Sequence, residues 1–235
     1  MGILIAFLIL SLWAAHLAYL LVFVELSFAP VMLIHVAIQT YLYTGLFITA
    51  HDSMHGTVSS NKKLNYIIGF VSTLLFAGMY YPKLNSKHKL HHLHPGSALD
   101  PDYTIGNQNF FVWWFTFLKQ YITIWQIVIM AVLFNILLLW FTEIQLITFW
   151  IIPSIAATFQ LFYFGTFIPH HLPHTADMLP HNSRTQKRNH LLAMLTCYFF
   201  GYHSEHHESP QTPWWKLYSI KDASLNITKL KSEKK

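Results

Sequence analysis

Clustered histidines are the residues of this sequence best suited to chemistry. They recur in the patterns HxxxH, HxxHH and HxxHH, at His51 and His55, at His88, His91 and His92, and at His203, His206 and His207. On a helix, residues three and four apart share one face, so each group can direct its rings to one point. Neighbouring residues differ by about 100° around a helix, so a group that contains an adjacent pair can contact two ions. Three such groups predict a metal centre.

The type of ligand restricts the choice of metal. With Cys197 as the single cysteine, the site has imidazoles and no thiolate cage. Imidazole suits Zn, Cu, Fe or Ni. One zinc ion needs only four ligands, so eight or nine imidazoles indicate two ions or one extended site. Zinc would be redox-inert, whereas iron activates oxygen, and we therefore interpret the clusters as an oxygenase site that holds two irons.

Further residues near the clusters are expected to complete this centre. The turn from Phe167 to His174 offers a ninth ligand, His170, with His171 as the alternative. Carboxylates should offset the charge of the ions and orient ring N–H groups. We favour Asp52 in that role, because a charge one residue beyond a membrane span needs a partner. The full set of supporting candidates is Asp52, Asp100, His94, His171 and Glu205.

The composition predicts an all-α membrane protein. Of 235 residues, 54% are hydrophobic and 11% are charged, against about 25% charged in typical soluble proteins. A spanning helix needs about 20 mainly apolar residues. Four stretches meet this length, at about 2–24, 30–50, 121–141 and 146–168, and we expect 1–235 to form one domain. Shorter apolar stretches at 64–81, 109–118 and 191–202 are predicted to be re-entrant or interfacial.

The distribution of charge predicts the orientation. Four spans place both termini and all histidine groups on one side of the membrane. Every Lys and Arg then lies on that side or at its border. The two loops on the opposite side contain no Lys or Arg, and their charged residues are Glu25 and Glu143. By the positive-inside rule, the histidine face is cytoplasmic. The formal net charge of +5 is therefore interpreted as a signal for membrane orientation and as a source of attraction to the lipid surface, rather than as a sign of nucleic-acid binding. A docking surface for an acidic electron carrier is another use of these charges.

Two histidines fall outside the clusters. His16 and His35 lie toward the outer half of the bilayer at similar depth, about 20 Å from the cytoplasmic boundary at a rise of 1.5 Å per residue. They could bond each other but could not reach the clustered rings. We expect them to be hydrogen-bonded core residues and exclude them from the site.

Three histidine boxes between paired spans resemble the membrane di-iron superfamily of fatty-acid desaturases, alkane hydroxylases and carotenoid oxygenases. Four motifs are similar, more narrowly, to those of the bacterial β-carotene ketolases: HDSMHG at 51–56, HHLHPG at 91–96, FGTFIPH at 164–170, and the run from Tyr202 through PWWKL at 213–217. The histidine boxes alone indicate only the superfamily, whereas the motifs FGTxxPH and PWWKL are what make the chain similar to the ketolases. His171, where arginine is expected, and Ser204, where a bulkier residue is expected, depart from the pattern.

The resemblance implies a reaction and its participants. These ketolases use O₂, Fe(II) and an external, ferredoxin-like electron donor to oxidise C4 of the β-ionone ring by two hydroxylations and loss of water. β-Carotene is thereby converted through echinenone to canthaxanthin, at the bacterial inner membrane. The implied iron ligands are His51, His55, His88, His91, His92, His170, His203, His206 and His207.

A polyene dissolved in the bilayer would need a channel that opens among apolar helices. The candidates for its wall are Tyr43, Phe47, Phe162 and Phe164, although each could equally pack helices together or face lipid. The alternative functions on the same scaffold are a carotenoid 3-hydroxylase and a fatty-acyl desaturase or hydroxylase. An alternative of another class is a divalent-metal transporter, but transporters carry their ligands near the midplane of the bilayer on broken helices.

Overall fold

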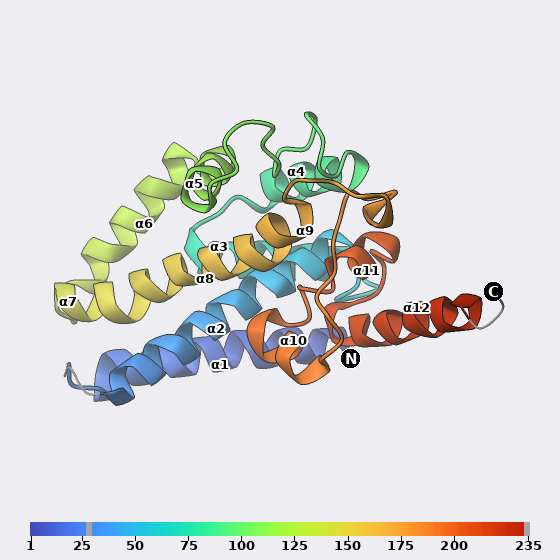
Figure 1. The fold of residues 1–235 in the computed structure, drawn as a ribbon. Coiled ribbons are helices and arrows are strands. Elements are labelled where there is room, and N and C mark those ends of the chain that lie inside the picture. Colours follow the sequence, from blue (N-terminus) through green and yellow to red (C-terminus); the bar gives the residue numbers. More distant parts are fainter. Residues whose placement is uncertain (27–29, 233–235) are drawn as a thin grey trace.

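The computed structural model describes residues 1–26 and 30–232, and within them the chain is built from helices with no strand (Figure 1). Helices α1 (Gly2–Phe23) and α2 (Pro30–Met54) run antiparallel along one side of the molecule. Both are apolar and long enough to cross a bilayer. Their polar contact lies where the sequence predicts it, since the His16 and His35 rings approach to 3.3 Å and His16 also bonds Gln39.

A third long helical run covers 143–170 and packs against α2. It consists of α7 (Glu143–Leu146), the π-helical turn η1 (Ile147–Ile151), α8 (Ile152–Phe162), the π-helical turn η2 (Tyr163–Phe167) and α9 (Ile168–His170). Each π-turn ends two residues before a proline, Pro153 or Pro169. Proline has no N–H for the carbonyl four residues back, and its ring crowds that carbonyl. The wider turn accommodates this, because Ile152 and Ile168 bond carbonyls five residues back.

Two helix pairs are sharply bent. Helix α3 (Lys62–Ala77) meets α4 (Tyr81–Leu93) at 102°, and α5 (Phe110–Tyr121) meets α6 (Ile124–Leu137) at 92°. Gly78 ends α3 in the left-handed conformation, with φ of 64°, which glycine adopts without strain. The first pair contains the stretch 64–81 that is predicted to be re-entrant.

The predicted third span, 121–141, corresponds to α6, which is only 14 residues long. Thr123 caps its start, and at 1.5 Å per residue the helix covers about 21 Å, less than the roughly 30 Å of a bilayer core. Three helical runs among the described residues are long and apolar enough to cross a membrane, or up to five if each bent pair forms one span. The chain is thus a helical protein with several candidate spans, and the number that cross stays a prediction.

The C-terminal part consists of several short helical segments followed by a longer final helix. They are the 3₁₀ turn η3 (Ala176–Met178), α10 (His190–Cys197), α11 (His203–Glu208), the 3₁₀ turn η4 (Trp214–Lys216) and α12 (Leu217–Ser232). Figure 1 shows that α4, α9 and α11 converge at the C-terminal end of α2, while α12 extends away from the body. This convergence positions the histidines.

Candidate metal centre

The structure brings all nine predicted ligands into two adjoining groups. Each group can place one ring nitrogen per histidine within 4.8 Å of all the others. The first group, here called group A, is His51, His55, His88, His92 and His206. The second, group B, is His91, His170, His203 and His207. The centroids of the His92 and His207 rings, one from each group, are 4.4 Å apart, so the two groups lie side by side.

Within each group the rings turn the same atom inward. In group A, the Nε2 atoms of His51 and His92 lie 3.1 and 2.9 Å from that of His206, and those of His55 and His88 are 2.7 Å apart. In group B, the Nε2 atom of His207 lies 3.1 Å from those of both His91 and His203.

Three of these separations, at 3.1 Å, are those expected around a metal ion, and the other two are slightly shorter. Two imidazole nitrogens at about 2.1 Å from one ion are about 3.0–3.4 Å apart, for angles between a right angle and a tetrahedral one. The Nε2 atom of His170 is buried and has no hydrogen-bond partner among the described residues, as expected for a nitrogen reserved for a metal. The donor set and its geometry therefore fit two metal ions.

Helical periodicity explains the division into groups. His88 and His92 are one turn apart and join group A, whereas His91 turns into group B. On α11, His203 and His207 are one turn apart and join group B, while His206 joins group A. Each HxxHH motif therefore serves both groups.

Hydrogen bonds at Nδ1, the ring nitrogen that faces away from the group, hold two rings of group B in place. The Nδ1 atom of His91 lies 2.9 Å from Asp100 Oδ2, and both residues are buried. Asp100 also accepts hydrogen bonds from the backbone N–H groups of Gly96 and Asp102. The Nδ1 atom of His170 lies 2.9 Å from the carbonyl of Asn182. Such partners fix the tautomer, so that Nε2 carries the free lone pair.

The histidines of α11 are in the protonation state that metal binding needs. Burial lowers the pKa of His203, His206 and His207 well below the ordinary value for imidazole, and the neighbouring histidines lower it further. The rings are therefore neutral near pH 7, and a metal does not have to displace a proton from them.

The other supporting candidates differ in their placement. Asp52 is buried and accepts a hydrogen bond from the backbone N–H of Trp214 at 3.1 Å, while its carboxylate lies 3.7 Å from His51 Nδ1. Glu205 is buried but faces away from the rings, toward Lys221 at 3.0 Å and Thr185 at 2.5 Å. His94 and His171 fall in neither histidine group, and the Nδ1 atom of His171 faces the carbonyl of Leu172.

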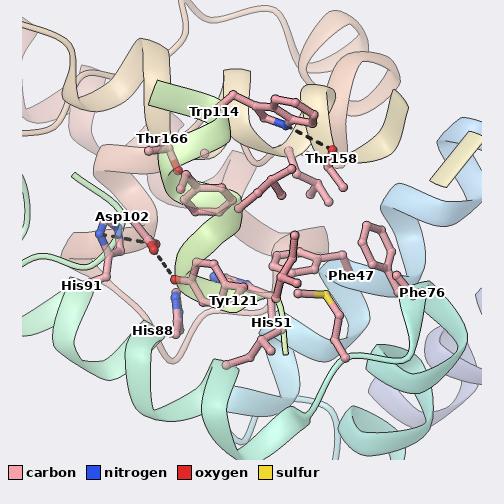
Figure 2. Close-up of a pocket in the computed structure, with 18 of the residues that line it drawn as sticks. Phe47, His51, Phe76, His88, His91, Asp102, Trp114, Tyr121, Thr158 and Thr166 are labelled. Atoms are coloured by element: carbon pink, nitrogen blue, oxygen red, sulfur yellow. Dashed lines mark hydrogen bonds and ion pairs between the residues drawn. The ribbon is translucent and has the colours of Figure 1, made fainter. Parts of the chain in front are cut away.

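A cavity of about 320 Å³ adjoins the centre, and Figure 2 shows many of the side chains that line it. Its inner end is formed by rings from both groups, at His51, His88, His91 and His203. Apolar side chains line most of the remainder, where α3, α5 and α8 face one another, among them Phe47, Phe76, Trp114, Phe117 and Leu161. The cavity can therefore hold an apolar group next to the histidines.

Of the four aromatic residues predicted for the channel wall, only Phe47 lines this cavity. Tyr43, one turn deeper on α2, packs against Trp13 and Phe76 in the core. Phe162 is buried against the rings of α5, and Phe164 packs on the main core. The π-turn η2 begins directly after Phe162, so a regular helical count does not predict which side chains of 163–167 face the cavity.

Three polar residues at the inner end were not among the predicted site residues. Asp102 and Tyr121 line the cavity, and the tyrosine hydroxyl donates a hydrogen bond to the carboxylate (Figure 2). Thr166, from η2, is the third. Asp102 follows the second histidine box closely, which is the one sequence signal for its position. Tyr121 comes from a distant helix, and no local pattern marks it.

Comparisons with known proteins relate the chain to one described family. The model of the family described as Fatty acid desaturase matches residues 26–124 and 113–227. The chain is 40% identical over 233 residues to a protein named zeaxanthin 4-ketolase from Chlamydomonas reinhardtii, covering 92% of this chain and 52% of that protein. It is 39% identical over 192 residues to a beta-carotene 4-ketolase from Protosiphon botryoides, covering 75% and 48%. The chain thus spans about half the length of these algal relatives.

A bacterial relative matches over nearly its whole length. The chain is 35% identical over 214 residues to a beta-carotene ketolase from Paracoccus sp. (strain PC1), and this covers 89% of this chain and 87% of that protein. No solved structure matches the chain. The family match spans the three histidine boxes, and the bacterial relative is covered along 87% of its length, so the chain belongs to the fatty acid desaturase family.

Proposed function

We propose that this protein is a β-carotene 4-ketolase, which converts the C4 methylene of a β-ionone ring to a ketone and gives echinenone and then canthaxanthin. One observation carries the proposal: an apolar cavity ends on rings of both histidine groups, so a ring at its inner end would meet a binuclear metal centre. The similarity to ketolases of Paracoccus and of algae supports the same substrate class.

The nine histidines of groups A and B are the proposed ligands of two iron ions. When bound, the ions supply the oxidant that O₂ chemistry at an unactivated C–H bond requires, which no side-chain acid, base or nucleophile provides. Imidazole alone leaves the positive charge of the ions uncompensated, and Asp100, behind His91, is the buried carboxylate placed to offset it.

The protein's own residues position and shield the substrate. Phe47, Phe76 and Phe117 present ring surfaces to the polyene and keep water out of the reaction site. Each hydroxylation consumes one O₂, two protons and two electrons and releases one water. The second gives a gem-diol, which loses water to form the ketone. The electrons come from an external donor, for which we propose a ferredoxin-type protein.

The proposed setting is a bacterial inner membrane, with both termini and the histidine groups at the cytoplasmic face. Every Lys and Arg lies on the side of the histidine groups or at its border in the four-span arrangement, in keeping with the positive-inside rule. The substrate would then enter from the hydrocarbon region, while the electron donor reaches the centre from the cytoplasm.

Expression in bacteria that accumulate β-carotene, with the pigments separated and identified by mass, tests the function. Echinenone and canthaxanthin are the expected products, and the variant His88→Ala should leave β-carotene unconverted. Zeaxanthin as the product would instead indicate a 3-hydroxylase, and unchanged carotene with desaturated or hydroxylated fatty acids would indicate an acyl-chain enzyme. Metal uptake by proteoliposomes without O₂ consumption would support a transporter.

A further inference from the structure

One histidine outside both groups lies directly against the metal centre. His181 is half-buried, and its ring stacks on that of His207 in group B, with the two centroids 5.5 Å apart and 26° between the ring planes. The lone pair of an imidazole nitrogen lies in the plane of the ring, so a stacked ring presents its face and not a ligand atom. His181 is therefore not placed to share the ion of His207, and its role differs from that of a ligand.

The residue that follows His181 fixes this segment to the centre. The carbonyl of Asn182 lies 2.9 Å from Nδ1 of His170, and its side-chain amide donates to the carbonyl of Pro95 at 3.1 Å. Asn182 has a φ of 46°, in the left-handed region that asparagine enters more readily than most residues. The position of His181 is thus set by contacts on either side of it, to His207 and, through Asn182, to His170.

Stacked rings connect both histidine groups to the partly exposed edge of His181. His207 lies between them in contact, because its ring centroid is 4.4 Å from that of His92 in group A and 5.5 Å from that of His181. Aromatic rings in contact carry an electron between two sites better than aliphatic side chains do, because their orbitals are delocalised. These rings therefore form a path for electrons from the surface to the centre.

The surface near His181 has the features of a docking site for a transient partner. Leu93, at the end of α4, and Leu179, two residues before His181, are 69% and 67% exposed. Lys89, one turn before Leu93, and Glu208, which follows the last histidine of α11, are also exposed. Figure 1 shows the segment after α9 beside the ends of α4 and α11. Electron-transfer complexes are typically small and transient, and interfaces in general have a polar rim.

We propose that His181 is the residue through which electrons enter the metal centre, and that a one-electron carrier protein with an acidic surface docks around it. The inference rests on the proposed oxygenase function, in which each hydroxylation consumes two electrons. One electron leaves the reduced carrier, which is oxidised, and passes through the rings of His181 and His207 to the ion of group B, which is reduced. Two such transfers supply one hydroxylation. The formal net charge of +5 favours an acidic carrier over a basic one.

The docking surface is tested by the binding of a plant-type ferredoxin to the iron-loaded protein in lipid nanodiscs, with both proteins oxidised so that no electron moves. Lys89→Gln should raise the Kd by about two- to fivefold and Glu208→Gln should lower it by a similar factor, the range for one exposed ion pair. Lys63→Gln, at the start of α3, is the control and should leave the Kd unchanged. Equal Kd values for Lys89→Gln and Lys63→Gln, or no binding by the wild type at low salt, would overturn this docking surface.

Electron entry is tested without O₂ and without carotenoid. Reduced ferredoxin is mixed with the oxidised, iron-loaded protein, and the absorbance of ferredoxin reports its oxidation. At saturating ferredoxin, His181→Leu should slow this step about tenfold, equivalent to a barrier higher by about 1.4 kcal/mol. His181→Phe keeps a stacked ring and should keep most of the wild-type rate. Iron content and the rate of reduction by dithionite, a small reductant that needs no docking surface, should be unchanged in both variants.

His190→Leu is the matched control for the loss of a half-buried histidine. In the described part of the chain, the ring of His190 contacts those of Phe199, Tyr202 and Tyr218 and no ligand ring. An equal loss of rate in His190→Leu, or a wild-type rate in His181→Leu, would overturn the role of His181. Slower reduction by dithionite as well would show that His181 only supports His207. Since neither measurement uses carotenoid, a failure to form ketone from β-carotene would contradict the ketolase proposal and leave this test intact.

Discussion

The rings of His91 and His92 lie in different histidine groups, although the two residues are adjacent in the chain. His92 approaches His206 in group A, and His91 approaches His207 in group B. Adjacent residues on a helix point about 100° apart, so one turn of α4 contributes to both proposed ions.

We therefore predict that single substitutions at these two positions remove different ions. His91→Ala and His92→Ala should each lower the iron content from about two ions per chain to about one, because each leaves the other group intact. The double variant should hold almost none. Metal analysis of the purified variants measures this, with His94→Ala as the control, since His94 is close by but in neither group. Two ions retained in both single variants would contradict the division into groups.

Asp100 provides a second prediction. Asp100→Asn keeps the shape of the side chain but removes the charge next to His91 Nδ1, and loss of such a partner typically costs 10- to 100-fold in metal affinity. A loss of about that size should be measurable by competition with a chelator. Asp222→Asn removes an exposed carboxylate from an ion pair with Arg188 and should leave the affinity unchanged. Equal affinities for Asp100→Asn and wild type would remove Asp100 from the centre.

Local spacing is what made the histidines predictable. Each HxxHH motif lies on a helix, where three- and four-residue separations determine the shared face. The choice of His170 over His171 followed from its place at the end of the apolar stretch, and in the structure His170 lies in group B while His171 does not. The allocation of each histidine to a group depends on how four distant elements converge, and no local pattern carries that information.

The cavity wall and the bent helices were harder to predict. Phe162 and Phe164 were candidates for the wall because they are aromatic residues of an apolar stretch, but Phe162 packs on the rings of α5 and Phe164 on the main core. Similarly, hydropathy alone does not show that a continuous apolar stretch breaks at Thr123. Pro153 and Pro169 are the sequence signals that could have indicated the π-turns, since a proline inside a helix removes a hydrogen bond.

The ion pair between Glu205 and Lys221 leads to a third prediction. The two side chains are 5% and 6% exposed and join α11, which carries three of the histidines, to α12. Lys221→Met leaves the Glu205 carboxylate buried and unpaired, which should cost about 3–5 kcal/mol of stability. Thermal unfolding in detergent measures the loss, and the double variant Glu205→Gln with Lys221→Met should recover part of it.

The exposed pair of Arg188 and Asp222 is the matched control for that experiment. These side chains are 58% and 36% exposed, so Arg188→Gln should cost no more than about 1 kcal/mol. A loss in Lys221→Met as small as this would show that the Glu205–Lys221 pair does not hold α11 in place.

The last prediction concerns Gly165, which allows Phe200 to lie against the histidines. A Cβ atom at Gly165 would be 2.2 Å from Cε1 of Phe200, whose ring contacts those of His51 and His203. Gly165→Ala must therefore displace Phe200, whose ring lies against one ring of each group. Overpacking of this kind typically costs about 1–3 kcal/mol, and we expect iron content to fall together with stability.

Adding Phe200→Leu should relieve the clash in Gly165→Ala and restore most of the iron, because the shorter side chain leaves room for the new methyl group. Gly106→Ala is the control, since the nearest atom to its Cβ is 3.6 Å away, an ordinary contact. If Gly165→Ala bound iron as well as Gly106→Ala does, the close approach of Phe200 would have no part in shaping the centre.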